Sequence, residues 1–327
     1  MTPEAIEKIF RSFREKRIAV IGDVMIDKYI FGHVSRISPE YPVPVVDVTS
    51  ESSRLGGAAN VAVNTHALGA ETLLIGVTGE DAERRNLASL MREHGLDPAM
   101  LVADSTRPTT CKTRILSQNH HITRVDYESR TPVDAELEER LLGMFMEIAG
   151  TVDAVVLEDY DKGVLTPSLI ASVIAICRER KTPVLVDPKL KGFFSYGGCT
   201  VFKPNLSELA ASLGIPVANA DSDVERACLL FGEKLDVESL VVTRSEKGMT
   251  VYDGSFTHIP ALSLDVADVS GAGDTVIGTL ALGLASGLDL VTSTRIANLA
   301  ANTVCQEVGA VPVRPDKLFN ACLAHLR

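Results

Sequence analysis

The sequence predicts an α/β fold: a doubly wound, mainly parallel sheet that is covered by helices on both faces and carries a small β-sheet lid. Short apolar runs rich in Val, Ile and Leu alternate with segments of helical periodicity, as in such sheets. Two other segments break this alternation and favour exposed strands. The 327 residues, 46% of them hydrophobic, can bury a large core, and we expect one domain over residues 1–327.

The apolar runs locate the expected strands of the main sheet at residues 17–23, 71–77, 153–157, 183–187 and 239–243. Between them, apolar residues recur at three- and four-residue spacing, which predicts helices over residues 81–94, 134–149, 166–181 and 221–235. Asp134 and the Thr166-Pro167 pair have the composition of helix starts.

The lid is expected from residues 28–48 and 108–128. The first segment is too rich in Pro and β-branched residues for a helix, and the second alternates polar and apolar residues as half-exposed strands do. Both would form an accessory sheet outside the main fold that covers a site. The pair His120-His121 falls in this lid without a nearby carboxylate or Cys, so we expect no metal there.

Charge and cysteine content narrow the class of protein. A net charge of -11 argues against nucleic acid or an anionic membrane as partner, since both require a basic face. Six scattered cysteines without a CxxC pair indicate reduced thiols. Residues 1–17 form an amphipathic charged pattern rather than a signal peptide, and no apolar run approaches about 18 residues. We therefore expect a cytoplasmic protein.

The strongest local motif is residues 268–275, Asp-Val-Ser-Gly-Ala-Gly-Asp-Thr, before a helix of small residues. A turn through Gly271, Ala272 and Gly273 at a helix N-terminus points backbone N–H groups at one place, which suits a phosphate or developing negative charge. Asp274 in this turn is placed to take a proton from an attacking hydroxyl. On the local pattern alone, the alternative is that Asp274 is a plain helix cap.

Two further segments carry candidate ligand contacts. Gly56 and Gly57 permit a close backbone approach to a ligand, and Asn60 offers a donor and an acceptor to hydroxyl groups. Asp27 follows the first strand, where open α/β sheets place ligand-binding residues. Close helix packing explains Gly56 and Gly57 about as well as ligand contact does. Capping of a turn likewise explains Asp27 about as well.

In their order along the chain, these motifs resemble the ribokinase-like carbohydrate kinases, also called the phosphofructokinase B family. The resemblance extends from about residue 17 to residue 313, and its motifs are GDVMID, GGAAN, KPNLSE, VTRSEKG and DVSGAGDT. It implies a doubly wound α/β domain with a small β lid over a sugar. A dinucleotide-binding oxidoreductase would show GxGxxG after the first strand, where GDVMID stands instead.

The resemblance also implies roles for individual residues. Asp274 matches the catalytic base, and the anion hole matches Gly271, Ala272 and Gly273. Asn205 and Glu208 match the element that organises Mg²⁺ through water near the phosphates of ATP.

Three further sets of positions match family sites. Thr243 and Gly248 match the nucleotide loop, although Ser245 stands where a Gly is usual. Asp27, Gly57 and Asn60 match the positions that contact the sugar in the family. Asp268 and Ser270 match positions that hold a monovalent cation, such as K⁺, in some members.

Residues 36–45, 158–163 and 186–189 resemble a narrower group, the heptose 7-phosphate kinases. This group phosphorylates the anomeric 1-hydroxyl of D-glycero-D-manno-heptose 7-phosphate to the 1,7-bisphosphate, for ADP-heptose and lipopolysaccharide core synthesis. Many members carry a second, nucleotide-transferring domain, and we expect the single-function form here. The alternatives are a kinase for another sugar or sugar phosphate, and a non-catalytic sugar-binding module, which an ATP turnover assay distinguishes.

A sugar phosphate requires cations in its pocket despite the acidic net charge. Lys189 and Lys162 are favoured because both follow strand ends, and Asp187 beside them is expected to help hold the sugar or Mg²⁺. Surface charge is the alternative for every candidate cation: Arg36, Lys112, Arg114, Arg124, Lys162, Lys189 and Lys191. The family resemblance and the exposed edges of the lid also predict a homodimer through the lid.

Overall fold

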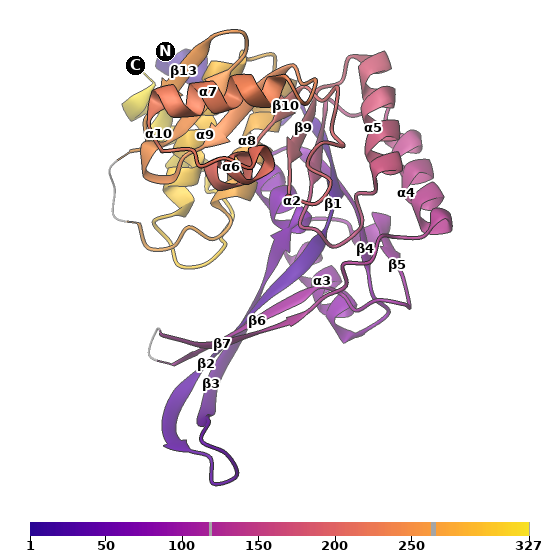
Figure 1. The fold of residues 1–327 in the computed structure, drawn as a ribbon, viewed down its shortest axis with the longest axis vertical. Coiled ribbons are helices and arrows are strands. Elements are labelled where there is room, and N and C mark those ends of the chain that lie inside the picture. Colours follow the sequence, from indigo (N-terminus) through magenta and orange to yellow (C-terminus); the bar gives the residue numbers. More distant parts are fainter. Residues whose placement is uncertain (118–119, 263–265, 327) are drawn as a thin grey trace.

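The computed structural model describes residues 1–117, 120–262 and 266–326, and shows a layered body from which a narrow sheet projects (Figure 1). Within these residues the main sheet has nine strands in the order β13-β12-β11-β10-β9-β8-β1-β4-β5. Its pairs are parallel from β5 to β11 and antiparallel at β11–β12 and β12–β13. The strands are β1 (Arg17–Gly22), β4 (Glu71–Thr78), β5 (Leu101–Ala103), β8 (Ala154–Glu158), β9 (Val184–Asp187), β10 (Val201–Phe202), β11 (Ser239–Thr243), β12 (Met249–Tyr252) and β13 (Phe256–Ile259).

Both faces of this sheet are buried, as its apolar runs predict. Along β1 the side chains alternate: Ile18 and Val20 enter one hydrophobic core, and Ala19 and Ile21 enter the other. A strand that must bury both faces has no polar side to present, which explains why these strands are continuous apolar runs. The predicted doubly wound architecture is confirmed.

Helices cover the two faces in separate layers. One core contains residues of α1 (Pro3–Phe13), α2 (Ala58–Ala67), α3 (Ala82–Glu93), α8 (Ala272–Ala285), α9 (Leu290–Val304) and α10 (Pro315–His325). The other contains residues of α4 (Ala135–Ile148), α5 (Pro167–Arg180), α6 (Leu206–Leu213) and α7 (Asp221–Gly232). The four helices expected between the strands are α3, α4, α5 and α7. Asp134 and Thr166 cap α4 and α5 through their side chains, as their sequence predicts.

The projecting sheet, which we call the lid, has the strand order β3-β2-β6-β7. Its strands are β2 (Val24–Ile37), β3 (Pro44–Gly57), β6 (Cys111–Ser117) and β7 (His120–Tyr127). The small separate sheet is confirmed, but β3 continues well past residue 48. Residues 49–54 are polar and carry no strand pattern. They belong to the strand because residues 50–54 pair with Asp27 to Phe31 of β2.

No helix in the described ranges is long and apolar enough to cross a membrane. All six cysteines are free, and five of them are buried.

Candidate active site

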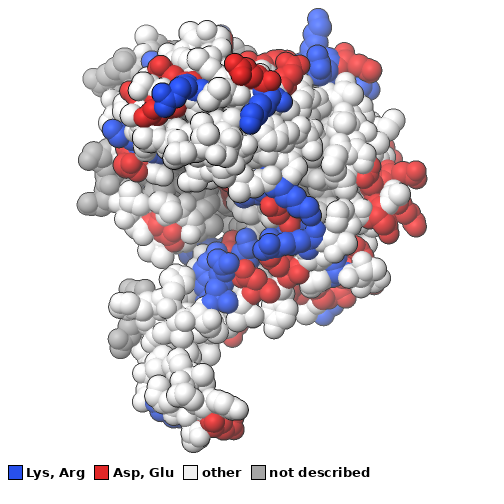
Figure 2. Space-filling view, in the orientation of Figure 1, with Lys and Arg blue, Asp and Glu red and all other residues white. Residues whose placement is uncertain are grey.

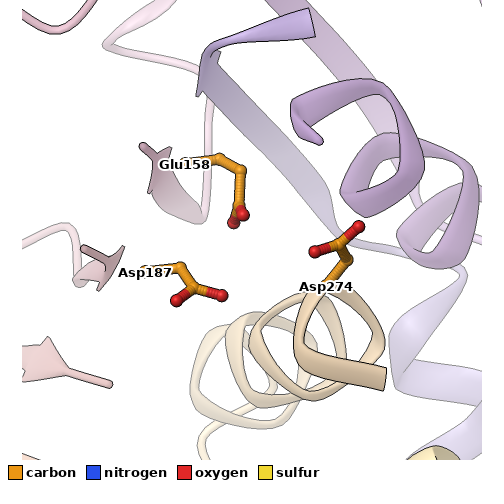
Figure 3. A group of neighbouring side chains, drawn as sticks. All are labelled: Glu158, Asp187 and Asp274. Atoms are coloured by element: carbon orange, nitrogen blue, oxygen red, sulfur yellow. The ribbon is translucent and has the colours of Figure 1, made fainter. Parts of the chain in front are cut away.

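Three buried carboxylates meet at the carboxyl end of the main sheet. Glu158 ends β8, Asp187 ends β9, and Asp274 lies in the first turn of α8. Their side chains point toward one another, with oxygen atoms within 4.8 Å (Figure 3). Open α/β sheets bind ligands at this edge, so the cluster defines the candidate site.

Asp274 is held by a neutral donor on each carboxylate oxygen. The Asn60 side-chain amide donates to Oδ2 at 2.8 Å, and the Tyr160 hydroxyl donates to Oδ1 at 2.8 Å. Burial, with a contribution from Asp187, raises the pKa of Asp274 to about 6, although the two hydrogen bonds and Lys203 act to lower it. Such a carboxylate is ionised at neutral pH yet basic enough to accept a proton, which suits a general base.

Glu158 is a site residue that the sequence did not reveal. Both of its oxygens are buried and have no hydrogen-bond partner among the described residues. Burial, together with nearby Asp187 and Asp274, raises the pKa of Glu158 well above its usual value. Its position at a strand end was the available signal. Lys203 was also missed: it forms a buried ion pair with Asp187 at 2.7 Å.

The glycine turn at the start of α8 leaves some amides open. Ser270 N–H donates to Asp268, and Ala272 N–H donates to the Val269 carbonyl, whereas the structure records no partner in its described part for the amides of Gly271 and Gly273. Gly271 has φ 77°, and a Cβ there would lie 2.6 Å from the Asn60 amide nitrogen. A left-handed conformation and this close approach together explain the glycine.

On the lid side, the expected glycines make room for Asp27 and for the backbone of Asp23, which follows β1. A Cβ on Gly56 would lie 2.4 Å from Asp27 Oδ2, and a Cβ on Gly57 would lie 2.4 Å from the Asp23 carbonyl. Asp27 itself forms an ion pair with Arg114 of β6. The structure therefore brings Asp27, Gly56 and Gly57 together at the point where β2 and β3 leave the body.

The expected nucleotide and metal positions also converge. Asn205 caps α6 and forms a reciprocal capping box with Glu208, and it is bridged to Thr243 at the end of β11. Glu208 accepts hydrogen bonds from the Asn205 backbone amide and from Lys189, both at 2.9 Å. Ser245 has φ 51°, which accounts for the usual Gly at this position, and Gly248 follows with φ 83°.

The Lys and Arg residues that were expected to contact the substrate phosphate separate into one group near the carboxylates and another on the exposed lid. Lys112 and Lys189 both approach the ring of Tyr160, with Nζ at 5.2 and 4.9 Å from its centroid. Lys and Arg side chains gather in one band where the lid meets the body (Figure 2). Lys162 is buried in an ion pair with Glu128 at 2.9 Å.

Arg36 and Arg124 are exposed on the lid and pair with Asp47 and Asp126. Arg36 stands twelve residues along β2 from Val24, about 40 Å at the usual rise per residue. The structure therefore does not bring Arg36 to the carboxylates of its own chain.

A family model described as pfkB family carbohydrate kinase matches residues 15–317, so the chain belongs to the pfkB family of carbohydrate kinases. It is accordingly a sugar phosphotransferase, and the family expected from the motifs is confirmed. The chain is 42% identical to the "Bifunctional protein HldE" of Pelobacter propionicus over 99% of its length, and 46% identical to that of Azorhizobium caulinodans over 92%. It spans 67% and 63% of these two relatives.

Solved structures share the fold. Phosphofructokinase-2 from Escherichia coli in complex with potassium has a TM-score of 0.78 at 17% identity, covering 95% of this chain and 99% of its own. Arabidopsis thaliana ribokinase complexed with ribose and ATP has a TM-score of 0.73 at 18% identity, covering 94% and 98%. At such identities the likeness concerns the fold alone.

Proposed function

We propose that this kinase transfers the γ-phosphate of ATP to the anomeric 1-hydroxyl of D-glycero-D-manno-heptose 7-phosphate. The product is the 1,7-bisphosphate, a precursor of ADP-heptose and the lipopolysaccharide core. The observation that carries the proposal is the placement of two ammonium groups, Lys112 and Lys189, around Tyr160, whose hydroxyl contacts Asp274. A sugar with a distal phosphate requires cations near the base, whereas a neutral sugar does not.

Asp274 acts as the base. It accepts the proton of the 1-hydroxyl while that oxygen bonds to the γ-phosphorus, and the bond from this phosphorus to the bridging oxygen breaks to release ADP. The open amides of Gly271 and Gly273 at the start of α8 stabilise the charge on the transferring group, and the helix dipole adds to them. Ala272 completes the proposed anion hole because its amide donates to the Val269 carbonyl and so holds the turn between the two glycines.

The remaining carboxylates and Asn60 hold the sugar. The two buried oxygens of Glu158 find no partner within residues 1–117, 120–262 and 266–326, which is costly in the free protein, and hydroxyl groups of a sugar would satisfy them. Asp27 accepts further hydroxyl bonds at the base of the lid, beside Gly56 and Gly57. Although Glu158, Asp187 and Asp274 are close enough to hold a metal ion, an ion bound to Asp274 would remove its basicity. We therefore assign this cluster to the sugar.

Lys189 and Lys112 neutralise the distal phosphate, which carries about two negative charges at neutral pH. Burial lowers the pKa of Lys189, but Asp187 and Glu208 outweigh burial and raise it, so this ammonium stays charged. Lys162, Arg36 and Arg124 stay predictions as phosphate contacts. Lys162 has Glu128 as partner and Arg124 has Asp126. Arg36 would require a second copy of the chain.

ATP is assigned to the loop between Thr243 and Gly248, with Mg²⁺ beside Asn205 and Glu208. These side chains offer the oxygen atoms that Mg²⁺ prefers. Because both Glu208 oxygens already accept hydrogen bonds, they fit contact through water rather than direct ligation. When bound, Mg²⁺ neutralises charge on the ATP phosphates.

K⁺ is proposed at Asp268 and Ser270. Burial raises the pKa of Asp268, but hydrogen bonds from Ser270 and the Gly309 amide lower it overall, which keeps a negative charge there.

We further propose that the lid forms a homodimer and that the enzyme is cytoplasmic. Large apolar side chains are exposed at the far end of the lid, including Ile37 at 60%, Tyr41 at 75% and Val43 at 52%. A second lid would bury them. The six unpaired cysteines and the requirement for ATP suit the cytoplasm.

The function is tested by ADP release with Mg²⁺ and K⁺ against a panel: D-glycero-D-manno-heptose 7-phosphate, sedoheptulose 7-phosphate, fructose 6-phosphate, fructose and ribose. Turnover confined to the heptose phosphate supports the proposal. Turnover on another sugar keeps the kinase and rejects the heptose assignment. Folded protein that turns over none of them would favour a substrate outside the panel or a non-catalytic sugar-binding module.

A further inference from the structure

Tyr160 lies between the catalytic carboxylate and the two lysines, two residues beyond the end of β8. Its hydroxyl donates to Asp274 Oδ1 at 2.8 Å, and its ring is the shared neighbour of Lys112 and Lys189. Lys112 belongs to lid strand β6, whereas Lys189 follows β9 in the body. The one side chain therefore contacts the lid, the main sheet and α8.

The backbone around Tyr160 is fixed by Asp23, the residue directly after β1. The Asp23 carboxylate accepts hydrogen bonds from the amides of Tyr160, Lys162 and Val164, at 2.8, 2.9 and 3.2 Å. The ring also lies against Gly57, since a Cβ there would be 3.5 Å from Tyr160 Cδ2. A tyrosine clamped at its backbone and on its ring presents its hydroxyl at one place, which is what precise orientation of a neighbouring group requires.

We propose that Tyr160 is a positioning residue that joins the two halves of the site: its hydroxyl aims Asp274 at the acceptor hydroxyl, and its ring holds Lys112 and Lys189 toward the substrate phosphate. This inference rests on the proposed function for the role of the lysines. The contact with Asp274 stands without it.

The hydroxyl has a specific electrostatic effect. Burial raises the pKa of Tyr160 well above its usual value, and Asp274 raises it further, so the phenol is a proton donor at neutral pH. Asp274 is faced by Asn60 of α2, Tyr160, Glu158 of β8, Asp187 of β9 and Lys203. Of these, Asn60 and Tyr160 donate hydrogen bonds to it. Removing one donor destabilises the ionised carboxylate and raises its pKa.

The ring has a separable effect. An ammonium over an aromatic face is attracted to the negative face of the ring. A substitution that keeps the ring leaves both lysines in place, and one that removes it releases them. Tyr160→Phe and Tyr160→Leu therefore isolate the two roles.

The test measures kcat, KM and the pH profile of kcat for wild type, Tyr160→Phe and Tyr160→Leu, with the sugar that the wild type uses in the panel. Tyr160→Phe is expected to lower kcat about tenfold, the value of one hydrogen bond. Its KM should stay within about twofold of the wild-type value. The fall of kcat at low pH, which we call the acid limb of the profile, should move to higher pH. Tyr160→Leu should in addition raise KM for a phosphosugar several-fold. An unchanged acid limb with kcat within twofold in Tyr160→Phe overturns the proposal, as does an unchanged KM in Tyr160→Leu.

A second measurement is independent of any sugar. In the ligand-free protein, the ¹³C carboxyl resonance of Asp274, assigned by its loss in Asp274→Asn, is titrated in wild type and Tyr160→Phe. A midpoint that moves to higher pH supports the contact even if no sugar in the panel is turned over, in which case only the proposed function fails. A midpoint that does not move overturns the proposal, provided that both proteins show the same thermal unfolding.

Discussion

The Asn60 side-chain amide donates to Asp274 Oδ2 at 2.8 Å and so joins the first turn of α2 to the first turn of α8. Both helix starts carry glycines, because Gly57 and Gly271 must adopt positive φ for the helices to begin here. The amide nitrogen donates to only one carboxylate oxygen, and the amide oxygen of Asn60 accepts a hydrogen bond from the Asn64 side chain at 3.3 Å. The GGAAN and GAGD motifs are therefore two halves of one site.

The pH dependence of the reaction follows from this environment. With the pKa of Asp274 raised to about 6, the base is ionised at pH 7.5 and protonated at pH 5. We expect kcat/KM to fall by about tenfold per pH unit below about pH 6. Rates between pH 4.5 and 8.5, with unfolding followed in parallel, check this. A midpoint of the kcat/KM profile near pH 4 would show that burial does not raise the pKa of Asp274.

Replacing Glu158 by Leu should separate stability from function. The buried oxygens of Glu158 have no partners in the part of the chain that the structure describes, so an apolar side chain of similar size removes a desolvation cost of about 1–3 kcal/mol. We expect Tm to rise by several degrees while KM for the sugar rises at least tenfold. Glu158→Gln is the control, because it keeps the polar atoms and should not gain this stability. A Leu variant that is less stable and binds sugar normally would contradict the assigned role.

Lys189→Met tests the distal phosphate contact. The substitution keeps most of the stem and removes the charge beside Tyr160 and Glu208. We expect KM for a sugar phosphate to rise at least tenfold, with KM for a free sugar little changed. Exposed Lys191, two residues away, provides the matched control in Lys191→Met. Equal effects of the two substitutions would place the phosphate elsewhere.

Ser245→Gly tests the strain in the nucleotide loop. Ser245 has φ 51°, a conformation that costs an L-residue about 1 kcal/mol more than glycine. We expect a small rise in the free energy of unfolding, measured by denaturant titration, and an unchanged or lower KM for ATP. Destabilisation would indicate that the Ser245 side chain contributes more than its backbone costs.

The sequence was informative where a residue's role depends on its own element. Buried strands such as β1 and β9 were predicted because both of their faces are apolar, whereas β10, with two residues, is too short for any periodicity. Asp274 and its glycines follow from a helix N-terminus. Glu158, Tyr160 and Lys203 were not assigned to the site, because their role depends on which elements fold against one another. The length of β2 similarly places Arg36 far from the body.

The central claim is that Asp274 is the base of a sugar kinase, and the rate of Asp274→Asn tests it most directly. Asn keeps the size of the side chain and one of its two acceptor oxygens but does not accept the proton. We predict a loss of about 10²–10⁴ in kcat at pH 7.5, with KM for ATP and the thermal unfolding profile close to wild type. A loss of less than tenfold in folded protein would contradict the account and assign the proton to another group.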